Sequence, residues 1–316
     1  MDSLTDVVRP VSGRFWGQGL KAKLSLSKFL QLRFNLILMS VLPMWCTRGY
    51  IWILVRLYFF CHPGQIKTIR KNIAIALRDR TPSEVKKITR GVIKGTIHHY
   101  QEKMANGFLN NSGLEKFLIS NVTFDGYEKV LQEALNEGRG VIIASGHYGA
   151  IEFLPRYLAL RKYPASTLVK FTTEKLREIM VPRGEKDGLI VVVADDETNV
   201  FGEASKLLAE KKIFVTQCDE TEAWHADRSQ TMEFLGKTVH PDRMLEVLRK
   251  RTGAVMLFGV LHREGKRKYQ LILHRVPGEG SVPVNIRTLK LLEKYVFEYP
   301  EQWYEWKKYH KIASAS

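Results

Sequence analysis

The stretch Val141-Ile142-Ile143-Ala144-Ser145-Gly146-His147 decides the fold. Four apolar residues followed by Ser-Gly predict a short strand that is buried on both faces, which is typical of a parallel sheet. Other short apolar runs lie at 166–170, 189–194, 213–218 and 254–261, and helical patterns separate them near 174–180, 203–211 and 241–251. This alternation predicts an α/β fold with a largely parallel central sheet flanked by helices.

The flanking segments extend this layout. A short strand is expected at 122–124, a helix at 126–136, a further strand at 269–276 whose antiparallel direction is open, and helices at 285–299 and 301–310. Thr81-Pro82-Ser83-Glu84 predicts the start of another helix. Thr81 can cap it, Pro82 suits its first position, and Glu84 can reach back to the cap.

The charge balance indicates a negatively charged partner. The 316 residues include 49 Lys and Arg against 33 Asp and Glu, a net charge of +16. Nucleic acid, anionic lipid or an acidic carrier protein would each complement such a charge, and a soluble basic protein without such a partner is the alternative. No nucleic-acid recognition motif accompanies it, so we expect no nucleic-acid partner. The three cysteines form no CxxC pair, which predicts a reducing compartment and neither a disulfide framework nor a zinc site.

The N-terminal segment 1–65 is predicted to contact a membrane, and 66–316 to form the α/β domain. Six basic and no acidic residues lie between positions 9 and 33: Arg9, Arg14, Lys21, Lys23, Lys28 and Arg33. The apolar stretch after them is interrupted by Arg48 and Arg56, and no uncharged run reaches the ~20 residues needed to cross a bilayer. Trp16, Trp45 and Trp52 favour the headgroup level. We therefore expect an interfacial or shallowly inserted segment, without a cleavable signal peptide; a buried helical hairpin is the alternative.

The candidate site is Gly146-His147-Tyr148-Gly149-Ala150-Ile151-Glu152. His147 follows the carboxyl end of a strand, where open α/β sheets bind ligands. A hydroxyl that attacks a thioester needs a base near neutral pH, and a carboxylate on the other ring nitrogen would fix its tautomer. We assign these roles to His147 and Glu152. Gly146 and Gly149 allow a tight turn, and backbone amides there or at the next helix N-terminus would stabilise the oxyanion.

Gly146 to Glu152 resembles the HxxxxE motif of the lipid A biosynthesis acyltransferases, the late acyltransferases of lipid A assembly. Other segments agree in order and spacing over roughly residues 30 to 310: Arg70-Lys71-Asn72-Ile73, Asp219 at a strand end, Phe234-Leu235-Gly236, and Tyr299-Pro300-Glu301-Gln302-Trp303-Tyr304-Glu305-Trp306. The resemblance implies an acyl-carrier-protein or coenzyme A thioester as donor, a lipid or glycolipid acceptor, and no cofactor or metal. It implies His147 as base with Glu152 as its partner.

Several departures from the family pattern leave the acceptor open. Ala150-Ile151 stands where the family often has Asn-Trp, Asp195-Asp196-Glu197 where a basic residue is common, and Glu220-Thr221 follows Asp219. These positions lie near the expected acceptor side. A phosphatidylinositol mannoside, another glycolipid or an amino-acid lipid would suit the same chemistry as lipid A.

Further residues are candidates for substrate binding. Asp219 and Glu220 would position acceptor hydroxyls. Lys170 and Arg183 are candidates to meet a phosphate or carrier group, with a solvated side chain as the alternative for each. His225, His240, His262 and His274 are interpreted as structural, and Trp303 and Trp306 are expected on one helix, in core packing or in lipid contact. The expected location is the cytoplasmic face of the bacterial inner membrane. The non-enzyme alternative is a catalytically silent membrane scaffold of the same fold.

Overall fold

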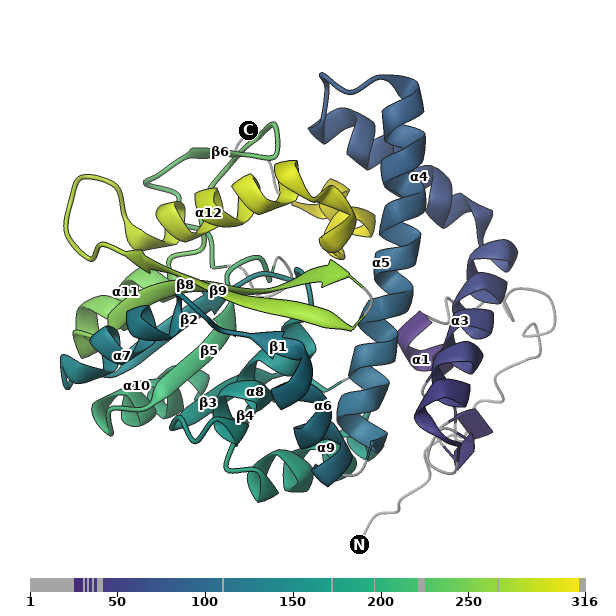
Figure 1. Cartoon of the computed structure of the whole chain (residues 1–316). Helices are drawn as coiled ribbons and strands as arrows, with labels where there is room; N and C mark the ends of the chain where they lie inside the picture. The colour runs from purple at the N-terminus through teal and green to yellow at the C-terminus, as the bar shows by residue number, and fades with distance from the viewer. Residues whose placement is uncertain are drawn as a thin grey trace, which may run out of the picture.

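The computed structural model describes residues 26–30, 32, 34–35, 37–38, 42–109, 111–171, 173–195, 197–220, 225–265 and 267–312 (Figure 1). Arg9, Arg14, Trp16, Lys21, Lys23 and Arg33, on which much of the membrane prediction depends, lie outside the described residues, as does the side chain of Lys28.

The described chain contains a seven-stranded, mostly parallel sheet, so the predicted α/β class is confirmed. Its order is β1-β9-β8-β2-β5-β3-β4. The strands are β1 (Val122–Thr123), β2 (Val141–Ser145), β3 (Ala165–Val169), β4 (Ile190–Val193), β5 (Ile213–Gln217), β8 (Val255–Gly265) and β9 (Lys268–Val276). All neighbouring pairs run parallel except β8 and β9, so the direction left open for the 269–276 strand is antiparallel.

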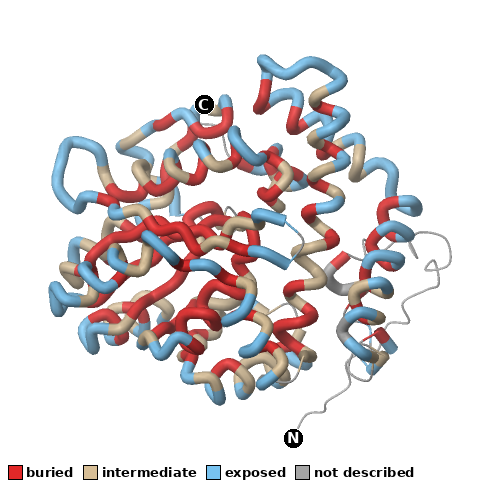
Figure 2. Tube along the Cα trace, in the orientation of Figure 1, coloured by how far each residue is buried: buried red, intermediate tan, exposed pale blue. Residues whose placement is uncertain are grey.

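Helices cover both faces of the sheet, as Figure 1 shows. The helices that flank the sheet are α6 (Asn111–Asn121), α7 (Glu128–Asn136), α8 (Leu154–Leu160), α9 (Glu174–Lys186), α10 (Val200–Ala209), α11 (Met244–Thr252) and α12 (Val284–Glu298). Alternate residues of β2 serve opposite sides: Ile142 and Ala144 belong to one buried cluster, Val141 and Ile143 to the other. The central strands are therefore buried throughout, as Figure 2 shows.

The N-terminal part is helical: α1 (Leu26–Leu30), α3 (Met44–Cys61), α4 (Pro63–Ala76) and the long α5 (Pro82–Phe108). The capping box of Thr81 and Glu84 is present at the start of α5. This helix runs between α3 and α4 on one side and the edge of the α/β core on the other (Figure 1). It therefore joins the N-terminal helices to the region around His147.

The C-terminal segment differs from the prediction. A helix was expected at 301–310, but the chain forms three separate 3₁₀ turns, η2 (Pro300–Gln302), η3 (Glu305–Lys307) and η4 (Tyr309–Lys311). Trp303 is extended between them and bridges Tyr148. The helix fails because the backbone at Trp303 pairs with another segment. A hairpin of β6 (Met232–Phe234) and β7 (Lys237–Val239) was also not predicted, and its turn at Leu235 and Gly236 has positive φ at both residues.

Candidate active site

His147 lies on a tight turn between β2 and η1 (Ile151–Phe153), which continues into α8. Two glycines make this turn possible. A Cβ at Gly146 would come 2.5 Å from the side chain of Leu292, and one at Gly149 would come 2.1 Å from the carbonyl oxygen of Leu261. Gly149 also has φ of +60°. The sequence Gly-His-Tyr-Gly thus places the imidazole at the carboxyl end of the sheet.

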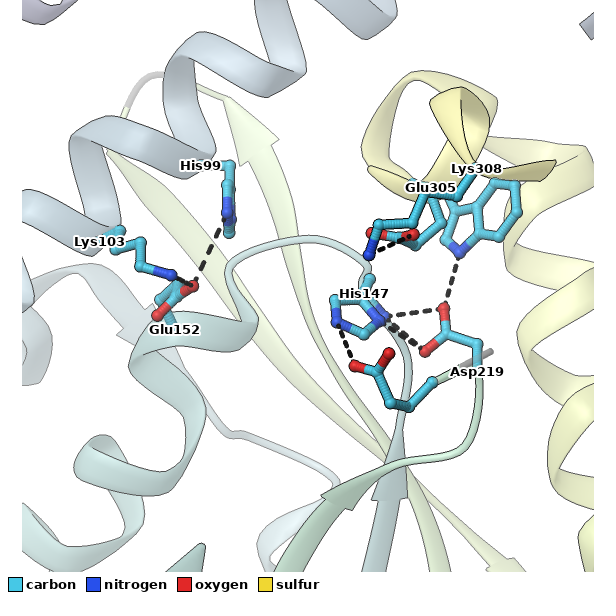
Figure 3. Close-up of polar contacts among 9 residues, drawn as sticks. His99, Lys103, His147, Glu152, Asp219, Glu305 and Lys308 are labelled. Carbon is cyan, nitrogen blue, oxygen red and sulfur yellow. Dashed lines mark hydrogen bonds and ion pairs between the residues drawn. The ribbon is translucent and has the colours of Figure 1, made fainter. Parts of the chain in front are cut away.

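The carboxylate that contacts the imidazole is Asp219, which follows β5. Its Oδ1 lies 2.9 Å from His147 Nδ1, and the His147 backbone N–H donates to the same carboxylate at 3.0–3.1 Å (Figure 3). Trp303 Nε1 donates to Oδ2 at 2.8 Å. Because β5 is the parallel neighbour of β2, the two strand ends deliver both residues to one point. Nε2 faces outward, 3.6 Å from Glu220 Oε2.

This pair shifts the pKa of both groups. Burial alone would lower the pKa of His147, but the Asp219 carboxylate, with Glu305 and Glu220 adding to it, raises that pKa to about 9. Burial would raise the pKa of Asp219, yet His147 and Trp303 hold it below its ordinary value. The resting pair at neutral pH is therefore an imidazolium next to a carboxylate, and Nε2 becomes a base only after it loses a proton.

The predicted pairing of His147 with Glu152 is wrong. Glu152 Oε1 lies 3.5 Å from Lys103 Nζ and 3.7 Å from His99 Nε2, on the opposite side of the turn (Figure 3). The physical reason is the 3₁₀ turn at η1, which directs residue 152 toward α5. Burial lowers the pKa of His99 well below its ordinary value, so the cation that compensates Glu152 is Lys103.

One polar stripe of α5 holds the turn in place. It consists of His99, Glu102, Lys103 and Asn106, spaced i, i+3, i+4, i+7 on one face. Glu102 pairs with Arg263 through two bonds of 2.6 Å, and Arg263 also donates to the Gly149 carbonyl oxygen. Asn106 donates to the Glu152 carbonyl oxygen at 3.0 Å. These residues were not predicted from the sequence; polar side chains at i, i+3, i+4 and i+7 of a predicted helix were the available signal.

The C-terminal segment pairs with the turn as a short bridge. Gly149 N donates to the Gln302 carbonyl oxygen at 3.0 Å, and Tyr304 N donates to the His147 carbonyl oxygen at 2.9 Å. Trp303 lies between them, fully buried, with its indole on Asp219. The Pro-Glu-Gln-Trp ending therefore positions the site. Its tryptophans were predicted only to pack in the core or to contact lipid.

An open pocket with about 950 Å³ of empty space, solvent included, adjoins His147. Glu152, Lys170 and Glu220 line it together with His147, so the turn brings these predicted residues to one cavity. Much of the remaining wall is apolar: Ile151, Pro155, Leu168, Val169, Phe171, Met180, Leu189 and Val191. Two of the predicted residues do not line this cavity. Asp219 is 1% exposed and bound to protein donors, so it does not face a ligand, and Arg183 lines a separate hollow near Lys162.

The model of the bacterial lipid A biosynthesis acyltransferase family matches residues 24–310. The chain belongs to that family. It is therefore an acyltransferase of lipid A type, with an acyl thioester donor and a lipid acceptor in general. No curated protein matches the chain.

The backbone amides of this acyltransferase that follow Gly146 are already occupied. Those of His147 and Tyr148 donate to Asp219 and to the Gly146 carbonyl oxygen, and those of Gly149 and Ala150 donate to Gln302 and Leu261. Stabilisation of the oxyanion by these amides, one of the two expected arrangements, is thus not available in this structure. The second expected arrangement uses the backbone amides at the start of η1.

Four further histidines were expected to be structural: His225, His240, His262 and His274. Within the part of the chain that the structure describes, no group of three or more His, Cys, Asp or Glu side chains is arranged to hold a metal ion. His262 contacts the Tyr148 hydroxyl at 2.9 Å, and His274 contacts the Tyr295 hydroxyl at 2.7 Å. Both histidines are partly buried, and these contacts hold their rings against the tyrosines.

Proposed function

We propose that the acyltransferase moves a fatty acyl group from an acyl thioester to a hydroxyl of a lipid or glycolipid, with His147 as general base and Asp219 as its orienting carboxylate. One observation carries this proposal: Asp219 accepts from Nδ1 of a histidine whose Nε2 faces a pocket with an apolar wall. A base aimed at a pocket that suits an acyl chain fits acyl transfer.

The proposed reaction needs no covalent enzyme intermediate. His147 Nε2 takes the proton of the acceptor hydroxyl while its oxygen attacks the thioester carbonyl carbon, and the carbonyl electron pair moves to oxygen. The oxyanion then collapses, the carbon–sulfur bond breaks, and the departing thiolate receives the proton from Nε2. Asp219 stays ionised and stabilises the imidazolium in between.

The pocket suits the donor more than a polar substrate. Its apolar wall would take the acyl chain, and Lys170 and Glu220 lie at positions to meet the polar groups of donor or acceptor. The donor is acyl-carrier protein or acyl-coenzyme A, both of which are acidic and complement the net charge of +16. Because the sequence departs from the family pattern near the expected acceptor side, the proposed acceptor is one of four kinds of lipid: lipid A, another glycolipid, a phosphatidylinositol mannoside or an amino-acid lipid.

The outer face of α3 supports docking on a membrane surface at the cytoplasmic face of the bacterial inner membrane. One stripe of α3, including Ile51, Val55 and Tyr58, is buried in the fold, as the hairpin alternative expected for part of this region. The opposite stripe exposes the apolar side chains of Trp45, Trp52, Ile53, Leu57 and Phe60. Arg56 lies over the Trp52 ring at 4.3 Å. Aromatic rings beside arginines are typical of the headgroup region.

Peripheral or shallow insertion fits the lengths involved. In the described residues, none of the helices is both long and apolar enough to span a bilayer. One side of α3 is already packed against the fold, and its other side is apolar and exposed. Such a surface is suited to contact with lipid.

We expect the triple variant Trp45→Ser/Trp52→Ser/Phe60→Ser to bind vesicles of anionic phospholipid at least about 100-fold more weakly. A 100-fold change is ~2.7 kcal/mol, and full burial of even one apolar side chain contributes ~1.5–3 kcal/mol. Vesicle flotation at two salt concentrations measures this. The matched control, Ile119→Ser/Val282→Ser/Phe297→Ser, removes three exposed apolar side chains elsewhere and should bind like the wild type. Equal binding by both triple variants would contradict docking through α3.

Lipid mass spectrometry tests the function itself. Cells that lack the protein should lose one acyl chain from a specific lipid, and cells that carry His147→Ala should show the same loss. The donor is then identified by comparing transfer by the purified enzyme from an acyl-carrier-protein thioester and from a coenzyme A thioester of the same chain length. An unchanged lipid profile in both strains would favour the scaffold alternative.

A further inference from the structure

We propose that Lys103 is a catalytic residue that stabilises the oxyanion of the acyl transfer, and that Glu152 acts through Lys103 and not through His147. This inference rests on the proposed function. It assigns the acidic residue of the HxxxxE motif a positioning role: Glu152 holds the Lys103 ammonium at the pocket, where charge develops on the thioester carbonyl oxygen.

The need for such a group follows from the turn. An oxyanion in a partly buried site requires hydrogen-bond donors or a cation aimed at it. The four consecutive amides from His147 to Ala150 donate to protein acceptors, so they cannot also bind the oxyanion. The donor therefore comes either from the start of η1 or from a side chain that lines the pocket.

Lys103 meets the positional requirements. It lines the same pocket as His147, its side chain is 21% exposed, and its Nζ lies 3.5 Å from Glu152 Oε1. Other pocket cations fit less well. Arg156 is 3% exposed and committed to Asp187 at 2.5 Å, and Lys170 is exposed at the end of β3.

The scaffold around Lys103 is rigid enough to hold it. Its neighbour Glu102 is clamped by Arg263, and one turn later Asn106 donates to the main chain of Glu152. The neutral His99 ring is also near the Glu152 carboxylate, and its centroid lies 4.3 Å from that of the Tyr304 ring. Figure 3 shows Lys103, His99 and Glu152 as a cluster separate from His147 and Asp219. Lys103 from α5 and Glu152 from η1 thus line the same pocket as His147, but on another side of it.

The chemistry assigns distinct roles to the two clusters. Lys103 donates a hydrogen bond to the oxyanion and keeps its proton throughout, whereas His147 carries the proton from the hydroxyl to the thiolate. The carboxylate of Glu152 balances the ammonium charge in the resting enzyme and orients it. Lys103 therefore lowers the barrier without taking part in proton transfer.

The test compares Lys103→Met, Lys103→Arg, Glu152→Gln and the control Lys94→Met in the full-length enzyme, with an acyl thioester donor. Lys94 is an exposed lysine of the same helix. We expect Lys103→Met to lower kcat about 100-fold with little change in the donor KM, the usual loss for one oxyanion donor. Lys103→Arg should recover part of that loss, Glu152→Gln should lower kcat about tenfold, and Lys94→Met should match the wild type.

Two further readouts separate this role from a structural one. Thermal unfolding should be nearly equal among the four variants, and the pH at which kcat/KM levels off should not move in Lys103→Met, because His147 and Asp219 are untouched. Near-normal kcat in a folded Lys103→Met would overturn the inference and assign the oxyanion to the start of η1. That result leaves acyl transfer intact, whereas absence of transfer in the wild type, with every donor, would contradict the proposed function.

Discussion

His147→Ala should lower kcat at least about 1,000-fold, because a positioned general base contributes ~10²–10⁴-fold and the attacking hydroxyl is a poor nucleophile without one. Steady-state transfer of a radiolabelled acyl chain to the lipid acceptor measures this loss. The substitution removes the ring that contacts Asp219 Oδ1, yet the backbone N–H of residue 147 and the Trp303 indole still donate to that carboxylate. The fold should therefore persist.

The matched variant is His147→Gln. Its side-chain amide is able to donate to Asp219 in place of Nδ1, which preserves the buried carboxylate's partners. It has no group that accepts a proton near neutral pH, so its kcat should fall as far as that of His147→Ala. A His147→Gln enzyme with substantial turnover would show that the histidine positions Asp219 and is not the base.

Much of the fold was predictable from local patterns. The run Val141–Ala144 is apolar on both faces because it occupies a central strand, and the capping box at Thr81 is a local hydrogen-bond arrangement that depends on four residues. The expected strand positions agree with β2, β3, β4 and β5 to within one or two residues. Both kinds of signal act over short stretches of chain.

The partner of His147 was not predictable in the same way. Asp219 was recognised as a strand-end residue, but whether its strand neighbours β2 depends on the strand order, and β2 and β5 are separated in the chain by β3 and β4. Glu152 was the nearer carboxylate in sequence, and its spacing suggested the pair. The 3₁₀ geometry of η1 directs it to α5 instead, where Lys103 receives it.

The C-terminal segment shows the same limit. Trp303 and Trp306 are three residues apart, which suits one helix face, and both are fully buried, which favours core packing over the lipid contact that the sequence had left open. The helix itself is absent because the main chain around Trp303 bonds to the turn at His147 and Gly149. A tertiary pairing between residues about 150 positions apart overrides the local preference, and only the three-dimensional structure reveals it.

The second large effect is expected for Asp219→Asn, which should lower kcat by up to about 10⁴-fold, the loss typical when an orienting carboxylate is removed from a histidine base. Asp219 accepts from three donors: His147 N, His147 Nδ1 and Trp303 Nε1. An asparagine presents one acceptor oxygen and an NH₂ group that must face a donor. One donor is then left unpaired, and the imidazole is free to adopt the wrong tautomer.

The pH dependence distinguishes this role from simple misfolding. In the wild type the base is the neutral form of a histidine whose pKa is raised to about 9, so kcat/KM should rise about tenfold per pH unit up to that value. Without the carboxylate the largest remaining influence on His147 is burial, which lowers its pKa. The rising limb should therefore move to lower pH in Asp219→Asn, although the plateau is far lower.

Stability supplies the independent check, and its sign follows from the same pKa shift. A histidine whose pKa is higher in the folded state stabilises the fold fully below its unfolded pKa of 6.5, and that contribution is lost as pH rises through about 9. The free energy of unfolding of the wild type should thus decrease between those values, and the decrease should vanish in Asp219→Asn. Denaturant titrations at pH 6, 7.5 and 9 measure it. A variant that keeps both the wild-type slope and the wild-type pH–rate profile would mean that Asp219 does not govern His147, and the carboxylate would have to be assigned to holding Trp303 and the C-terminal segment alone.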